Sequence, residues 1–203
     1  KKGEGEVEKV KKAYRLKGKM LPLNTIGVIH GYIHLPKLIE LVKSKGVTLT
    51  EYLTAVYAWA LHSEALTRKY YKRPVHISVP VNLRRFFEST TNMNFFGHIT
   101  IEVPKQTNEL TFDDLLIAVR KQFKEQITQE NMMRYISKNV ALRNNPITRA
   151  MPLFVKNIVV RLIFLNSIKS STSTLTNIGK VDIIEPYASE ISNFEVLVNT
   201  SGL

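Results

Sequence analysis

The chain has 203 residues, of which 44% are hydrophobic, and a formal net charge of +12 at pH 7. This is the composition of an ordinary globular protein, and no stretch is long and uncharged enough to be expected to span a bilayer. The sequence contains no cysteine, which excludes disulfides and thiolate metal sites and fits a reducing compartment, so we expect a cytoplasmic protein.

The N-terminal part of the chain predicts a linker, a strand and a short helix. Residues 1–19 open with Lys, Glu and Gly and are interpreted as a linker or as the segment that leads in from a preceding lobe. Residues 23–35 are rich in β-branched side chains, which predicts a strand. Pro36 starts a helix that extends to Lys45 with its apolar side chains facing the core, and Gly46 ends it.

Two longer helices and two strands are predicted next. Thr48-Leu49-Thr50-Glu51 is a capping-box pattern that opens a helix to about Tyr70, nearly apolar all round and therefore buried on more than one side. Val75–Val81 and Phe95–Val103 are predicted strands, and Thr111 caps a second helix. The apolar face of the first helix is expected to include Leu53, Val56, Tyr57, Ala60 and Leu61, and that of the second Phe112, Leu115, Leu116, Val119, Phe123 and Ile127.

The C-terminal part predicts two helices followed by short strands. The helices are Met132–Leu142 and Leu153–Leu165, separated by prolines. Val181–Ile184 and Phe194–Val198 are predicted strands, with a turn at Pro186–Ser189 between them. This order of elements predicts an α/β domain with a mixed sheet covered by helices.

Three segments carry a resemblance to a known superfamily. They are Gly46-Val47-Thr48 at the start of the long helix, Val79-Pro80-Val81-Asn82-Leu83-Arg84 followed by Asn94-Phe95-Phe96-Gly97, and Leu175-Thr176-Asn177-Ile178-Gly179. In this order they resemble the second half of the condensation-domain or chloramphenicol-acetyltransferase-like superfamily, in particular its alcohol O-acetyltransferase-like branch. The similarity extends from about Lys17 to Leu203.

The resemblance implies one lobe of a two-lobed fold with an active-site tunnel between the lobes. The base of this family is the second His of an HHxxxDG motif in the first lobe, and it deprotonates the alcohol or amine that attacks an acyl thioester. This sequence has no His-His pair, because its five histidines stand apart: His30, His34, His62, His76 and His98. Residues 20–203 are therefore expected to be the second, C-terminal lobe, truncated at its end and without a catalytic residue of its own.

The same resemblance implies the partners. Acyl-coenzyme A is the expected co-substrate of the full-length protein, and no cofactor is expected to stay bound. A small-molecule alcohol or amine would be the acceptor, and a missing N-terminal lobe would supply the base. A chain without that lobe should expose an apolar face and self-associate.

Structural or tunnel-lining roles are implied for Arg84, Asn94, Gly97, His98, Thr176, Asn177 and Gly179. Arg84 is either part of a buried ion pair or a solvated strand-end residue. Asn94 and Gly97 suit a tight entry into a strand, where Gly permits close backbone approach and Asn can cap a turn. His98 either faces the tunnel or is an ordinary surface or core histidine. The segment 176–179 is either a turn on the tunnel floor or an ordinary loop.

A metal site is not expected, because His30 and His34 on one strand would lie about 13 Å apart. The basic field could attract nucleic acid, an anionic membrane or phosphorylated coenzyme A, since no acid lies between Glu130 and Asp182. The bases are dispersed, however, so we expect no retention of DNA or RNA at about physiological ionic strength and weak binding of coenzyme A phosphates at most. Three functions stay open: an acyltransferase lobe, a non-catalytic interaction or scaffold domain of the same fold, and a basic nucleic-acid-binding module.

Overall fold

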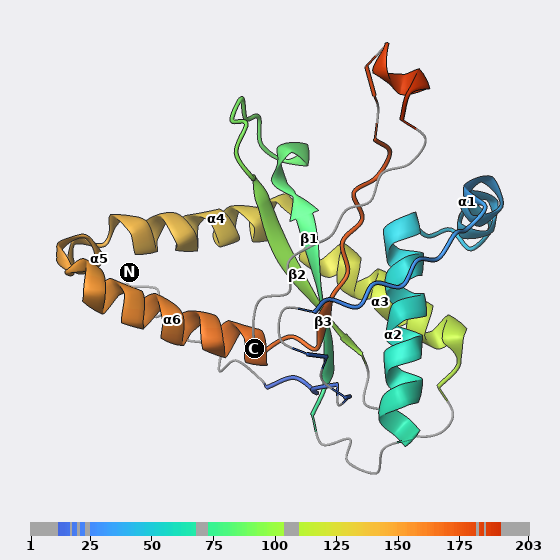
Figure 1. Ribbon diagram of the computed structural model, residues 1–203, viewed down its shortest axis with the longest axis horizontal. Coiled ribbons are helices and arrows are strands. Elements are labelled where there is room, and N and C mark those ends of the chain that lie inside the picture. Colours follow the sequence, from blue (N-terminus) through green and yellow to red (C-terminus); the bar gives the residue numbers. More distant parts are fainter. Residues whose placement is uncertain are drawn as a thin grey trace.

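The protein folds as an α/β domain, as predicted (Figure 1). The computed structural model describes residues 12–16, 18–19, 21–22, 25–67, 73–103, 110–181, 183–184 and 186–191. Within these residues, six helices accompany a three-stranded sheet of order β2-β1-β3. β1 (Val75–Asn82) pairs antiparallel with β2 (Phe96–Val103) and parallel with the short β3 (Ser173–Thr174), so the predicted mixed sheet is confirmed.

The β1–β2 hairpin forms the centre of the core. Its register runs from Val75 opposite Val103 to Asn82 opposite Phe96. Side chains alternate between the two faces of a strand, and the hydrophobic members of each strand fall on one face. That inner face carries Val75, Ile77, Val79 and Val81 from β1 and Ile99, Ile101 and Val103 from β2, all buried.

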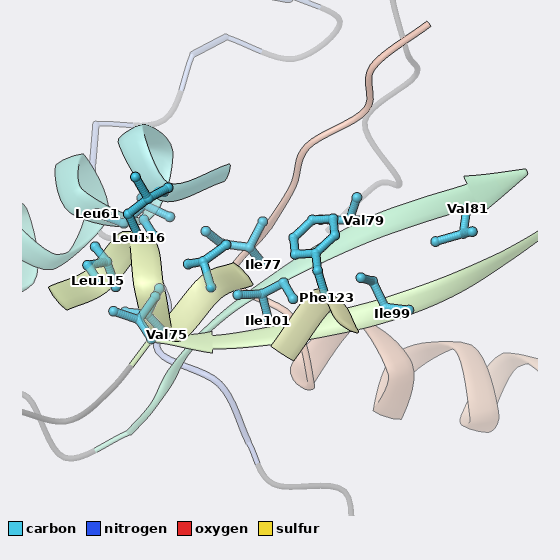
Figure 2. Close-up of a cluster of buried hydrophobic side chains, with 14 of the residues drawn as sticks. Leu61, Val75, Ile77, Val79, Val81, Ile99, Ile101, Leu115, Leu116 and Phe123 are labelled. Carbon is cyan, nitrogen blue, oxygen red and sulfur yellow. The ribbon is translucent and has the colours of Figure 1, made fainter. Parts of the chain in front are cut away.

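Two helices cover the inner face of the hairpin. They are α2 (Leu49–Thr67) and α3 (Phe112–Gln126), and the predicted capping patterns begin both: Thr48 with Glu51, and Thr111 with Asp114. Figure 2 shows how Leu61 of α2 and Phe123 of α3 meet the apolar side chains of the two strands. The apolar face predicted for α3 is confirmed, since Leu115, Leu116, Val119 and Phe123 are all buried.

The buried side of α2 differs in part from the prediction. The buried residues are Glu51, Thr54, Ala55, Ala58, Leu61 and His62, whereas Val56 and Ala60 are exposed. When a helix is apolar nearly all round, the spacing of its apolar residues does not predict which face is buried. The small side chains of Ala55 and Ala58 are fully buried on the side of α2 that faces the core.

The remaining predicted helices are confirmed. α1 (Leu35–Ser44) ends where Gly46 takes a left-handed φ of 65°, although only Val42 of its apolar residues is buried. The two predicted C-terminal helices are α4 (Gln129–Asn144) and α6 (Leu153–Lys169), and a short helix that was not predicted, α5 (Pro146–Ala150), lies between them in the chain. Figure 1 shows α4, α5 and α6 extending away from the hairpin, on the side opposite α2. The predicted turn at Pro186–Ser189 contains a 3-10 helix, η2 (Tyr187–Ser189).

Two predicted strands are wrong. Residues 25–34 contain no strand, and Ile29 within them is 99% exposed. Residues 181, 183 and 184 likewise have no strand conformation. A β-branched run raises strand propensity, but a strand forms only where a neighbour offers its backbone groups. The last predicted strand, Phe194–Val198, lies outside the described residues.

The outer edge of β2 is covered by two glutamine side chains of α3. The Gln122 carboxamide accepts from the Glu102 N–H and donates to the Glu102 carbonyl, both at 2.8 Å. Gln126 accepts from the Thr100 N–H at 3.1 Å and donates to the Thr100 carbonyl at 2.8 Å. The two carboxamides thus make the hydrogen bonds that the backbone of a neighbouring strand would make. Another strand therefore cannot pair with β2 at these residues.

Candidate functional site

A cavity of about 400 Å³ lies where the C-terminal end of β1 meets the N-terminus of α2. This volume is in the range of sites for small organic ligands. Residues of α2, β1, α3 and the segment after β3 form its walls. They are Thr48, Thr50, Glu51, Val79, Pro80, Val81, Asn82, Arg85, Phe123, Lys124, Ile127 and Asn177.

The three segments that carry the sequence resemblance meet at this cavity. Thr48 comes from the first segment, Val79 to Asn82 from the second and Asn177 from the third. These residues are far apart in the chain, and the fold brings them together because α2 and the segment after β3 both lie against β1. The site is therefore a product of tertiary structure and not of one local motif.

Asn177 fixes the segment after β3 to the start of α2. Its Nδ2 donates to the Thr50 hydroxyl at 3.1 Å, and its Oδ1 accepts from the Gly179 N–H at 2.9 Å. Gly179 has a left-handed φ of 78°, which a side chain would strain. The predicted turn at 176–179 therefore forms, and Asn177 faces the cavity. Thr176 and Gly179 line a neighbouring apolar groove instead.

Glu51 is the buried carboxylate of the site and is only 7% exposed. It accepts a 2.7 Å hydrogen bond from the Thr48 N–H, and its own N–H donates to the Thr48 hydroxyl. A negative side chain in the first turn of a helix interacts favourably with the helix dipole. Among the described residues that line the cavity, Glu51 is the one carboxylate and none is a histidine.

Two exposed cations stand at the rim of the cavity. Arg85 belongs to η1 (Leu83–Arg85), and Lys124 lies on α3 next to the buried Phe123. The lining also contains the polar Thr48, Thr50 and Asn82 beside apolar residues such as Val81 and Ile127. Two cations in the lining of a cavity suit an anionic ligand or an anionic part of a larger one.

Arg84 is exposed and holds the hairpin loop. Its guanidinium Nη2 donates to the carbonyls of Thr91 and Met93, each at 2.8 Å, and its backbone N–H donates to Asn82 Oδ1 at 3.0 Å. In the described part of the chain no carboxylate pairs with it. Arg84 lies outside the cavity lining, and an ion pair between it and a carboxylate of the other lobe stays a prediction.

Asn94 and Gly97 differ in what they do. Asn94 is exposed, and within the described residues its side chain makes no hydrogen bond, so the turn is held by Arg84 and not by an Asn cap. Gly97 is buried, and a Cβ there would lie 3.4 Å from both Leu83 Cδ2 and Tyr135 Cδ1. These are ordinary van der Waals distances, so the predicted need for glycine at position 97 stays a prediction.

The histidines lie in separate places. His98 is on the outer face of β2, edge-on to Phe96 with ring centroids 5.1 Å apart, and partial burial lowers its pKa. His76 is buried, with Nδ1 2.8 Å from the Ser170 carbonyl. His34 caps α1, where Nδ1 accepts from the Lys37 N–H. The described residues contain no group of three or more potential metal ligands.

Sequence reasoning missed Thr50, Glu51, Arg85 and Lys124 as site residues. Thr50 and Glu51 belong to the predicted capping box, in which Glu51 pairs with Thr48, and nothing in the local pattern places them beside the end of β1. Arg85 and Lys124 are two of many dispersed bases. The one available signal was the resemblance itself, since Thr50 and Glu51 directly follow its first segment.

The comparisons with known proteins place this chain in a family. A family model described as alcohol acetyltransferase matches residues 32–179. No curated protein and no solved structure gives a significant match. No helix of the described residues is both long enough and apolar enough to cross a membrane. The matched range covers more than half of the chain and includes all three segments that meet at the cavity, so the chain belongs to the alcohol acetyltransferase family.

Proposed function

We propose that this chain is the second lobe of an acyltransferase and provides the substrate-binding wall of its active site. The observation that carries the proposal is the convergence of three distant family segments on one cavity of about 400 Å³. Acyl-coenzyme A is the proposed donor, because Arg85 and Lys124 at the rim suit its phosphates. A small-molecule alcohol or amine is the proposed acceptor, and the reducing cytoplasm is the proposed compartment.

The proposed reaction needs a base that the described cavity lining does not contain. The acceptor oxygen or nitrogen forms a bond to the acyl carbon, and the carbon–sulfur bond breaks. The proton of the acceptor moves to a histidine of the other lobe and then to the leaving coenzyme A thiolate. The residues of this chain bind and orient the two substrates, while the buried Glu51 remains in its capping box.

Thiol release from acetyl-coenzyme A tests this proposal. The 203-residue chain alone is expected to release no thiol above the buffer rate with a panel of alcohols and amines. The full-length product of its gene is expected to release thiol and form the ester or amide. Turnover by the chain alone that disappears when one of its five histidines is replaced would contradict the second-lobe assignment. A full-length protein without transfer would contradict the enzyme and support the scaffold alternative.

A further inference from the structure

An apolar groove of about 420 Å³ shares Asn177 with the cavity described above and lies next to it. One wall is the exposed side of α2, and the other is the segment after β3. We refer to it as the α2 groove, and it is lined by Leu53, Val56, Tyr57, Ala60, Leu175, Thr176, Asn177, Ile178 and Gly179. The lining is mainly apolar and contains no charged residue among those described.

Hydrogen bonds hold the two walls of the groove together. The Tyr57 hydroxyl lies 2.6 Å from the Ser173 hydroxyl at one end, and Asn177 donates to Thr50 at the other. The Leu175 N–H donates to the Ser78 carbonyl at 3.0 Å, so the same segment is also fixed to β1. The groove is thus preformed, which lowers the conformational cost of binding a ligand.

Asn177 lines both the 400 Å³ cavity and the α2 groove. A ligand that occupies both would have an apolar part beside Val56 and Ala60 and a polar group beside Asn177. The Asn177 carboxamide still has one N–H and one lone pair free of the bonds to Thr50 and Gly179. A hydroxyl group can use both, because it donates and accepts.

We propose that the α2 groove binds the hydrocarbon chain of the acceptor alcohol, and that Asn177 binds its hydroxyl at the junction with the 400 Å³ cavity. This inference rests on the proposed acyltransferase function, and it assigns acceptor specificity to the exposed residues of α2. The donor would enter from the side of Arg85 and Lys124, so the two substrates meet at Asn177. Longer acceptors should bind more tightly, because each methylene adds buried apolar surface.

The test uses 1-butanol, 1-hexanol and 1-octanol as probes and follows backbone amide signals of the 203-residue chain by NMR. We expect shifts at residues 175–179 and an affinity gain of about twofold to fourfold for each added methylene. Ala60→Trp fills the groove and should abolish this gain. Ser63→Trp is the matched control, since Ser63 is exposed on the same helix but lines neither site, and it should leave the gain intact.

Val56→Asp gives a second variant of the groove, and it should weaken octanol binding at least tenfold. Equal affinity for all three alcohols, or the same response in Ala60→Trp and Ser63→Trp, would overturn the inference. An Ala60→Trp variant that changes self-association but leaves alcohol binding unaltered would also overturn the inference. The groove would then be a contact surface between two copies of the chain. The binding measurement needs no turnover, so its failure is distinct from a failure of acyl transfer in the full-length protein.

Discussion

Asn177 and Arg84 act mainly by holding backbone segments in place. Asn177 connects the segment after β3 to the first turn of α2, and Arg84 connects the end of β1 to the hairpin loop. The sequence singled out both residues, but it could not show which would reach the cavity. That outcome depends on how α2 packs against the hairpin, where Ala55 and Ala58 are fully buried.

Arg84→Ala should lower the free energy of unfolding by about 1 kcal/mol. The substitution removes two hydrogen bonds from an exposed guanidinium to the carbonyls of Thr91 and Met93, and water can replace them in part. Denaturant titration measures the loss, with Arg85→Ala as the control, expected within about 0.5 kcal/mol of the parent. A loss of about 3–5 kcal/mol would instead indicate that Arg84 pairs with a buried carboxylate, whose charge the substitution leaves without a partner.

His62 should make the protein less stable as the pH falls. Its side chain is 2% exposed, and desolvation lowers its pKa from the usual 6.5. Below about pH 6.5 the unfolded chain binds this proton more readily than the folded one, so stability decreases until the lowered folded pKa is passed. Well above pH 6.5 His62 is neutral in both the folded and the unfolded state, so it does not change the free energy of unfolding with pH.

The measurement is the free energy of unfolding from pH 8 to pH 5 for the parent and for His62→Gln. The variant should have a shallower slope below pH 6.5, whatever its absolute stability. His98→Gln should also have a shallower slope, because desolvation lowers the pKa of His98 in the same direction. An unchanged slope in His62→Gln would show that this histidine is protonated equally in both states.

At the level of the elements, the protein protects the edge of its central hairpin with side chains. β2 pairs with β1 on one side, and Gln122 and Gln126 of α3 occupy its other side. This arrangement explains why no further strand pairs along that edge among the described residues. It also ties α3 to the sheet through polar contacts in addition to the buried face that carries Phe123.

Hydrogen exchange can test each glutamine separately. Gln122→Ala should accelerate exchange of the Glu102 amide, because Gln122 accepts its proton, and should leave the Thr100 amide protected. Gln126→Ala should do the reverse. Each variant is the control for the other. Equal acceleration of both amides in either variant would mean that the whole helix α3 loosens and that the pairing is not local.

The sequence predicted most elements but not all of their partners. Capping boxes and apolar periodicity identified α2, α3, β1 and β2 because these signals are local. Residues 25–34 failed as a strand because strand formation depends on a neighbour that propensity does not reveal. The same reason applies to the candidate site, whose residues Thr50, Lys124 and Asn177 come from three elements and meet only in the folded chain.

On the scale of the whole molecule, α6 exposes a series of large apolar side chains. Large apolar side chains along this helix are more than half exposed, and no acidic residue lies between Glu130 and Asp182. They are Leu153, Phe154, Ile158, Val160, Leu162 and Ile163. Exposed apolar surfaces of this extent are typically contact sites, and α6 is our proposed contact for the other lobe.

The isolated chain should therefore self-associate, and sedimentation velocity at increasing concentration measures this. The double substitution Phe154→Glu and Ile158→Glu should shift the chain toward monomer, because it removes apolar contact area. Lys156→Glu is the control on the same helix, since it adds an acid without removing an apolar group, and it should associate like the parent. A parent chain that stays monomeric at high concentration would count against α6 as a docking surface.

The most direct test of the account is the effect of Asn177→Ala on acetyl transfer by the full-length product of the gene. Asn177 comes from one of the three family segments and faces the cavity, so its removal should lower kcat/KM by at least about tenfold. Asn144→Ala provides the control, because Asn144 is an exposed asparagine at the end of α4, outside the cavity lining. The account predicts a large loss for Asn177→Ala and an unchanged kcat/KM for Asn144→Ala. Equal values for the two variants would contradict the assignment of this cavity as the substrate site.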